Sequence, residues 1–294
     1  MHRTSLGKRL ELTRRDMELF EVLGRYRYLR STYLHAFVGG ASRTRFKERL
    51  GDLFHEGYLD RPPLQWTFAD ARFAPVVYES GKRGTEARWA KGASDGREWQ
   101  VAATAGRQFL HALMICEALA SFELGARAVN GLRFISWPEI LARAPEPTRT
   151  TSKPLRLPLA SGRSVVPDAV FGLEYGAFDP KTYRFFALEA DRGTMPIERS
   201  SPDQTSYLGK LAGYGEVLAR EAHRAHWRIP NLLVLTLTTG EARKSAIVAK
   251  LGEGSAAFLF KAVRAETLAS PLAALLSEPW ERAGHLPLRI GESS

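Results

Sequence analysis

Residues 165–194 (VVPDAVFGLEYGAFDPKTYRFFALEADRGT) constrain the fold of this 294-residue chain more than any other stretch. Two apolar runs, residues 165–175 and 183–190, flank a segment in which Gly, Asp and Pro interrupt the pattern. Runs of this length and composition on either side of such a turn are typical of two antiparallel strands. We therefore expect the chain to build a sheet around this hairpin.

Carboxylates gather on the predicted hairpin. Asp168 lies near the start of the first strand, and Glu189 and Asp191 end the second. Side chains two residues apart share one face of a strand, and an antiparallel partner brings Asp168 close to one of them. Carboxylates held together repel each other unless a cation, a basic partner or a proton intervenes. The hairpin is therefore the expected site of chemistry.

The net charge of +10 indicates the kind of partner. An excess of Lys and Arg favours a polyanion, with nucleic acid ahead of a membrane surface. The alternative is that the charge serves only solubility.

The single cysteine, Cys116, excludes an internal disulfide and fits a reducing cytoplasm. Its apolar surroundings favour a small core residue over a thiol nucleophile. We expect no apolar run to reach membrane-spanning length, and the first residues lack the apolar segment of a signal peptide. We expect a cytoplasmic protein without membrane contact.

Residues 12–84 carry three short helical patterns followed by a hairpin, after a basic segment, residues 1–11, that we expect to be loose. Thr13 caps the first predicted helix, Gly39 and Gly40 end the second, and Ser42 caps a third over residues 43–56. Residues 58–61 and 75–79 predict the strands of the hairpin. This order resembles the winged helix-turn-helix plan.

In that plan the third helix enters the major groove of DNA, and basic residues near its start reach bases and phosphates. The resemblance implies a DNA-contacting set on the third helix and the wing: Arg43, Thr44, Arg45, Lys47, Arg49, Arg61 and Arg72. A module that binds protein, with a solvated basic face, is the alternative.

Polar residues 82–100 predict a linker with about one helical turn, and place a domain boundary near Gly96. The first domain then covers residues 1–96 and the second covers residues 97–294. The second begins with an apolar helix over residues 108–124, on which Glu117 is expected at the solvent edge or, alternatively, in the acidic cluster. A loop over residues 144–159, a helix over about residues 203–227, and a further strand, helix and strand complete the pattern.

This order, with an acid early on one strand and an acid ending the next, resembles the PD-(D/E)XK nuclease superfamily. The segments VVPDAVFGL, FFALEADRGT and KLAGY are similar to the replication-relaxation family of plasmids and other mobile elements. The resemblance covers about residues 12–263. It implies an α/β (α+β) protein with an N-terminal winged helix-turn-helix, followed by a restriction-endonuclease-like domain with a mixed sheet.

The nuclease superfamily uses its two acids to hold one or two Mg²⁺ ions, which activate water and neutralise the scissile phosphate. The resemblance therefore implies Asp168 and Glu189 as metal ligands, while Asp191 stands where the motif has lysine. Lys210 on the following helix would replace that lysine, with Tyr214 touching the substrate backbone. Alternatively, an ion pair of Asp191 with Arg192 fixes the turn and the domain has no activity.

Our leading hypothesis is a DNA-binding protein of a mobile element that acts in replication or relaxation or in their control, with a nuclease-like domain for which cleavage of DNA with Mg²⁺ is left open. The alternative is a non-catalytic initiator or transcriptional regulator that keeps the nuclease-like fold as a scaffold. The expected partner is double-stranded DNA, and a homodimer is left open. His223 and His226 are three apart on one predicted helix, but a surface or snorkelled position is favoured over metal binding.

Overall fold

The computed structural model describes residues 3–5, 7–40, 42–68, 73–92, 106–176, 181–198 and 206–292. The chain forms two compact units. The first consists of Met1–Leu124 and Glu266–Leu272, and the second of Gly125–Ala265 and Ala273–Ser294. The boundary expected at Gly96 lies outside the described residues. The first unit extends to Leu124 and also includes a short segment from the last tenth of the chain.

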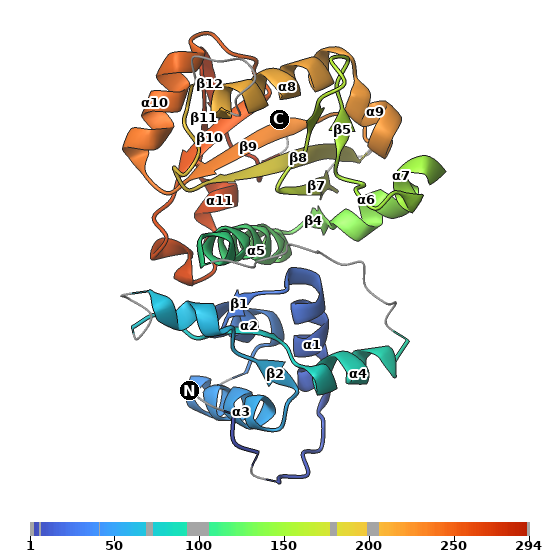
Figure 1. The fold of residues 1–294 in the computed structure, drawn as a ribbon, viewed down its shortest axis with the longest axis vertical. Coiled ribbons are helices and arrows are strands. Elements are labelled where there is room, and N and C mark those ends of the chain that lie inside the picture. Colours follow the sequence, from blue (N-terminus) through green and yellow to red (C-terminus); the bar gives the residue numbers. More distant parts are fainter. Residues whose placement is uncertain are drawn as a thin grey trace. The chain divides into compact units, whose positions relative to one another are not determined.

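The first unit begins with three helices (Figure 1) and contains a three-stranded antiparallel sheet of order β1-β3-β2. Its elements are α1 (Arg14–Tyr26), β1 (Leu29–Arg30), α2 (Ser31–Val38), α3 (Arg43–His55), β2 (Leu59–Asp60), η1 (Pro63–Thr67), β3 (Val77–Ser80) and α4 (Lys82–Trp89). The expected three helices and two hairpin strands are present, and β1 adds a strand that the sequence did not predict. The expected linker starts with α4, which is longer than one turn, and its residues 93–100 lie outside the described part of the chain.

The caps that the sequence predicts are formed. The Thr13 hydroxyl accepts from the Asp16 backbone N–H at 3.3 Å, and the Asp16 carboxylate accepts from the Thr13 N–H at 2.7 Å. The Ser42 hydroxyl accepts from the Arg45 N–H at 3.3 Å and starts α3. Gly39 has φ +67° and Gly40 has φ +128°, a conformation that favours glycine and ends α2 before α3 begins.

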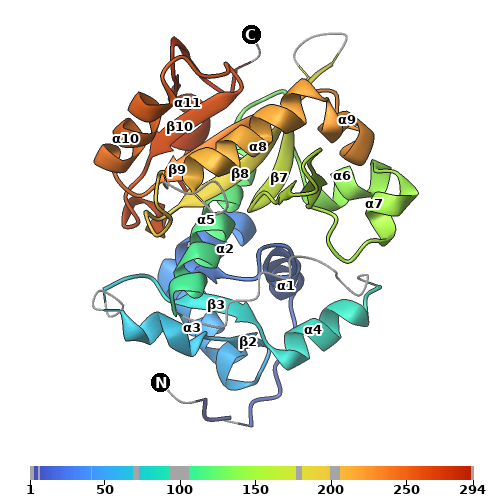
Figure 2. The same cartoon turned by 45° about the horizontal axis from the view of Figure 1, so that its top comes forward.

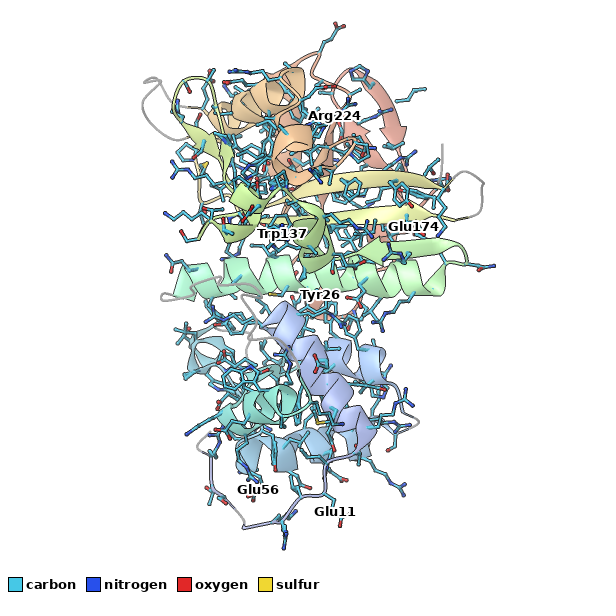
Figure 3. The ribbon with its side chains drawn as sticks, turned by 90° about the vertical axis from the view of Figure 1, so that its right-hand side faces the viewer. Glu11, Tyr26, Glu56, Trp137, Glu174 and Arg224 are labelled. Carbon is cyan, nitrogen blue, oxygen red and sulfur yellow. The ribbon has the colours of Figure 1, made fainter. Side chains whose placement is uncertain are left out.

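The N-terminal segment runs along the C-terminal end of α3 and is not loose over its described residues. Arg3 donates to the carbonyls of Phe54 at 2.9 Å and Leu59 at 2.8 Å. The Lys8 backbone N–H donates to the Glu56 carboxylate at 3.2 Å. Figure 3 shows Glu56 at this end of the first unit.

The long helix α5 (Gly106–Ala128) is apolar along most of its length. Among the described residues, one stretch of this helix, Gln108–Ala128, is long and apolar enough to cross a membrane, so the expectation that no run has this length was wrong. Most of these residues are buried within the protein, which is typical of a core helix. Cys116 is buried, as expected of a small core residue.

Glu117 lies on α5 but not at the solvent edge, which corrects the expectation from the sequence. Its side chain is 3% exposed and pairs with Arg30, whose Nε lies 2.7 Å from Glu117 Oε1. Burial raises the pKa of Glu117 to about 8, although the Arg30 guanidinium acts in the opposite direction. Its partner is an arginine of the first unit and not an acid of the hairpin.

The C-terminal segment of the first unit contains η3 (Thr267–Ala269) and is held by the side chains of α2 and α5. The Tyr33 hydroxyl lies 3.0 Å from the carbonyl oxygens of Leu268 and Ser270 and 3.0 Å from the Ser121 hydroxyl. Thr32 donates to the Ala269 carbonyl at 2.6 Å. Tyr33 is fully buried and Leu268 is 1% exposed, so this segment belongs to the core of the first unit.

The second unit is built on a seven-stranded mixed sheet of order β12-β11-β10-β9-β8-β7-β4. Its strands are β4 (Leu132–Ile135), β7 (Ala169–Tyr175), β8 (Thr182–Asp191), β9 (Leu233–Thr238), β10 (Phe258–Ala262), β11 (Trp280–Arg282) and β12 (His285–Leu288). The predicted hairpin is β7 and β8, paired antiparallel, and β8, β9 and β10 run parallel. The expected α/β class with a mixed sheet is confirmed.

Helices cover the sheet, and α8 and α10 lie along the same face of it (Figures 1 and 2). The remaining elements are α6 (Trp137–Arg143), α7 (Glu146–Thr150), β5 (Leu157–Pro158), β6 (Ser164–Val165), α8 (Tyr207–Ala219), α9 (Ala222–Trp227), α10 (Glu241–Leu251) and α11 (Ala274–Ser277). The expected loop over residues 144–159 contains α7 and β5. The single helix expected over residues 203–227 is two helices, broken where Glu221 adopts φ +52°, and residues 203–205 lie outside the described residues.

Candidate functional site

Three of the predicted site residues lie at one end of the β7–β8 hairpin. Ala169 pairs with Leu188, so in this register Asp168 lies opposite Glu189, and Asp191 follows two residues further on the same face. The Asp168 carboxylate accepts from the Ala190 backbone N–H at 2.9 Å. Glu189 is 2% exposed, whereas Asp168 is half-buried. The hairpin therefore brings the acids together.

Helix α8 covers this end of the hairpin with Lys210 and Tyr214. The two residues are four apart, so their side chains lie on one side of the helix. The Lys210 ammonium forms an ion pair with one oxygen of Glu189, and the Tyr214 hydroxyl donates to the other. Asp168, Glu189, Lys210 and Tyr214, which the sequence singled out, thus lie in one place.

Tyr207 and Thr236 belong to the same cluster, although the sequence analysis missed them. The Tyr207 hydroxyl and the Thr236 hydroxyl are 2.7 Å apart, and Thr236 lies beside Glu189 in the parallel register of β8 and β9. Helical spacing could have found Tyr207, because it is three residues before Lys210. Nothing in the sequence of β9 marks Thr236.

Burial and charge shift the acid–base properties of the cluster. Burial raises the pKa of Glu189 to about 8, and the Asp168 charge adds to this rise while Lys210 and Tyr214 oppose it. For Lys210 burial disfavours the ammonium, but the nearby carboxylates of Glu189 and Asp168 outweigh it and raise the pKa. A buried carboxyl group with a pKa near neutrality is suited to proton transfer.

Asp191 has a different environment. Its carboxylate accepts from Arg243 of α10, with Nε at 2.7 Å, and from the Gly193 N–H at 2.9 Å. Arg243 also donates to the Met195 carbonyl at 2.6 Å. The alternative role of Asp191, an ion pair with Arg192 that fixes the turn, is consistent with these contacts only in part, because the ion-pair partner that they show is Arg243. No sequence pattern pointed to this arginine.

Within the described part of the chain, the candidate ligands for a metal ion are the carboxylates of Asp168 and Glu189. Within the described residues, no group of three or more His, Cys, Asp or Glu side chains is arranged to hold a metal ion. Mg²⁺ is commonly held by one or two carboxylates together with waters and substrate phosphates, which suits Asp168 and Glu189. Each carboxylate oxygen has two acceptor positions, so bonds from Lys210 and Tyr214 do not exhaust Glu189. Mg²⁺ stays a prediction.

The two histidines of α9 have different environments. His223 is 4% exposed and its Nδ1 atom is buried, so the expected surface or snorkelled position was wrong for it. His226 lies 3.2 Å from the Pro154 carbonyl and 3.3 Å from the Thr148 hydroxyl. These contacts hold α9 against the segment that contains α7 and β5.

The predicted DNA-contacting residues of α3 fall into two groups. Four of them are exposed: Arg43, Thr44, Arg45 and Lys47. Arg49 is half-buried, and its guanidinium pairs with Asp16 at 2.6 Å and donates to the Glu11 carbonyl at 2.8 Å. Arg49 therefore holds α3 against the start of α1.

The two arginines predicted on the wing differ as well. The guanidinium of Arg61 lies 4.2 Å from the centre of the Phe54 ring and donates to the Tyr78 hydroxyl at 3.0 Å. This stacking makes Arg61 part of the packing between α3 and β3. Arg72 lies outside the described residues.

Comparison with known proteins identifies the family. A family model described as replication-relaxation matches residues 20–232, which include α3, the β7–β8 hairpin and α8. No curated protein and no solved structure matches the chain. The chain therefore belongs to the replication-relaxation family, which associates it with the replication or relaxation of plasmids or other mobile elements.

Proposed function

We propose that the chain is a DNA-binding protein and that α3 binds in the major groove of a duplex. The observation that carries this proposal is the exposed cationic side of α3. Arg43, Arg45 and Lys47 are exposed, and within the described residues no ion pair to them is found. Arg49 of the same helix differs, because its guanidinium is paired with Asp16. Unpaired exposed charges on one helix are suited to a polyanion.

The architecture of the first unit supports this use of α3. Three helices followed by β2 and β3, with β1 completing the sheet, is the order of a winged helix. The opposite side of α3 is buried through Leu50, Leu53 and Phe54, so the basic side faces outward. In winged helices the third helix occupies the major groove. Membership in the replication-relaxation family implies an interaction with DNA.

Replacing both Arg43 and Arg45 by alanine is expected to weaken duplex binding and to lower the salt dependence. Each lost phosphate contact reduces the slope of log K against log salt by about 0.9. Fluorescence anisotropy with a labelled duplex, measured over a salt series, gives both quantities. The matched control removes two exposed arginines of the second unit, Arg220 and Arg289, and is expected to bind like the wild type. Equal binding by the Arg43/Arg45 variant and the wild type would reject α3 as the contact.

A second candidate function is phosphodiester cleavage, which the arrangement of Asp168, Glu189 and Lys210 favours. Asp168 and Glu189 are the residues that would hold Mg²⁺, and the ion would supply charge neutralisation and an activated water. Lys210 presents an ammonium beside these acids and would stabilise charge on a phosphate. Tyr214 holds Glu189 in place through its hydroxyl. Asp191 takes no part in this assignment, because Arg243 holds it.

Cleavage is tested by incubating supercoiled plasmid with the protein and Mn²⁺ or Mg²⁺. The wild type is expected to produce nicked circles, and Glu189→Gln is expected to abolish them. Glu174→Gln is the matched control, because Glu174 lies on β7 but pairs with Arg133 and Lys181. If the wild type produces no more nicked plasmid than buffer alone but still binds duplex DNA, the non-catalytic initiator or regulator is the better account. Asp191 stands where the nuclease motif has lysine, and its ion pair with Arg243 favours that outcome.

A further inference from the structure

We infer that Arg15, at the start of α1, is an additional contact with the phosphate backbone of the duplex bound by α3. This inference rests on the proposed DNA binding and adds a residue that neither the sequence pattern nor the family assigns. The Arg15 guanidinium lies beside the turn that joins α2 to α3. A Cβ atom at Gly40 would be 3.3 Å from Arg15 Nη1. Arg15 therefore places a cation beside the turn that leads into α3.

The position of Arg15 relative to α3 is fixed by a neighbouring ion pair. The carboxylate of Asp16, the next residue, accepts two hydrogen bonds from Arg49 of α3, from Nη2 at 2.6 Å and from Nε at 3.1 Å. Burial disfavours the Asp16 carboxylate, but the hydrogen bonds from Arg49 and Thr13 outweigh this and lower the pKa of Asp16. The pair thus stays charged at neutral pH and holds the first turn of α1 against α3.

The turn itself is also held. His35 lies with a ring nitrogen 3.1 Å from the Gly40 carbonyl. The same ring packs edge-on against Phe46 of α3, with 5.1 Å between ring centres. The backbone beside the Arg15 guanidinium is therefore connected to both flanking helices. An anion that contacts both Arg15 and the first turn of α3 therefore binds to side chains whose backbone positions are fixed relative to each other.

The charge of Arg15 is available to a ligand, in contrast to that of its neighbour. Arg15 is exposed, and no carboxylate partner for it is found within the described residues. Arg14 is also exposed, but its Nε lies 3.0 Å from Glu18 Oε1, one helical turn further on. A phosphodiester is the anion that a duplex presents at regular spacing beside its major groove. Arg15 therefore contacts the DNA phosphate backbone that flanks the bases contacted by α3.

The test compares Arg15→Ala with Arg14→Ala, which removes the same charge from the adjacent position. Binding of the full chain to a fluorescent duplex is measured by anisotropy across a salt series. Arg15→Ala is expected to lower the salt slope by about 0.9 and to weaken binding roughly eightfold near 0.1 M salt. Arg15→Lys should keep most of the affinity, and Arg14→Ala should change neither quantity appreciably. Thermal unfolding of each variant checks that the fold is kept.

The outcomes separate this inference from the proposed function. If the Arg43/Arg45 variant loses binding but Arg15→Ala behaves like Arg14→Ala, the inference is wrong and DNA binding by α3 stands. If the Arg43/Arg45 variant and Arg15→Ala both bind like the wild type, the proposed function fails and the inference fails with it. Weakening by Arg15→Ala and Arg14→Ala to the same extent would also overturn the inference, because a general loss of charge would then explain it.

Discussion

Replacing Lys210 with methionine is expected to destabilise the protein by about 3–5 kcal/mol above about pH 9, and by much less near pH 5. The substitution leaves Glu189 buried without its counter-charge. At high pH the folded variant has to hold either an uncompensated buried carboxylate or a proton that the unfolded chain has lost, and both cost free energy. At low pH Glu189 takes up a proton, and the neutral carboxyl group needs no cation.

The sign of this pH dependence follows from the direction of the pKa shift. Glu189 has a folded pKa raised to about 8 from the ordinary value of 4.5. Between these values the folded protein holds a proton that the unfolded chain has lost. The stabilising contribution of Glu189 protonation is therefore fully present below about pH 4.5 and falls as the pH rises through 8. Without Lys210 the pKa of Glu189 rises further, so the loss of stability continues to higher pH.

Urea denaturation of the wild type and of Lys210→Met at several pH values measures this effect. The matched control is Lys181→Met, which removes an exposed lysine from an ion pair with Glu174 and should change stability little at any pH. Adding Glu189→Gln to Lys210→Met is expected to recover most of the loss, because the buried charge is then gone. A loss of equal size at pH 5 and pH 9 would contradict the assignment of a buried ion pair.

A second large loss of stability is expected when residues 266–272 are removed or altered. A fragment of residues 1–124 lacks this segment and should not fold stably, because the buried partners of Tyr33 and Ser121 are missing. In the full chain, Leu268→Ala is expected to cost about 2–5 kcal/mol through the cavity it leaves. Tyr33→Phe is expected to cost about 1–3 kcal/mol, because buried carbonyl groups lose their donor.

Circular dichroism and thermal unfolding measure both changes. A synthetic peptide of residues 265–273 added to the fragment is expected to restore helical signal, and a peptide with Leu268 replaced by Asp is expected not to. Leu286→Ala provides the control in the full chain, since Leu286 is 82% exposed. A fragment of residues 1–124 that unfolds cooperatively without the peptide would show that the segment is dispensable.

Local patterns predicted much of the fold and the position of the candidate site. Apolar runs on either side of turn residues located β7 and β8, and the two-residue spacing placed Glu189 and Asp191 on one face. Helical spacing put Lys210 and Tyr214 on one side of α8, where both reach Glu189. These signals are short-range, and the chain obeys them because neighbouring residues share one element.

Features that depend on distant parts of the chain could not be predicted in this way. The break at Glu221 interrupts a pattern that continues as helix on both sides. Arg243 reaches Asp191 from 52 residues away, and the pairing leaves no trace in local composition. Glu117 is buried because Arg30, far earlier in the chain, supplies its counter-charge. Tertiary contacts decided the cases of Arg243 and Glu117.

The ion pair between Asp191 and Arg243 has a consequence for protein engineering. A designer who restores the lysine of the nuclease motif at position 191 would set an ammonium against the guanidinium and remove the acceptor of the Gly193 N–H. The repulsion would release the strand-ending loop instead of repairing a motif. Any such redesign has to exchange the charge at position 243 together with the one at position 191.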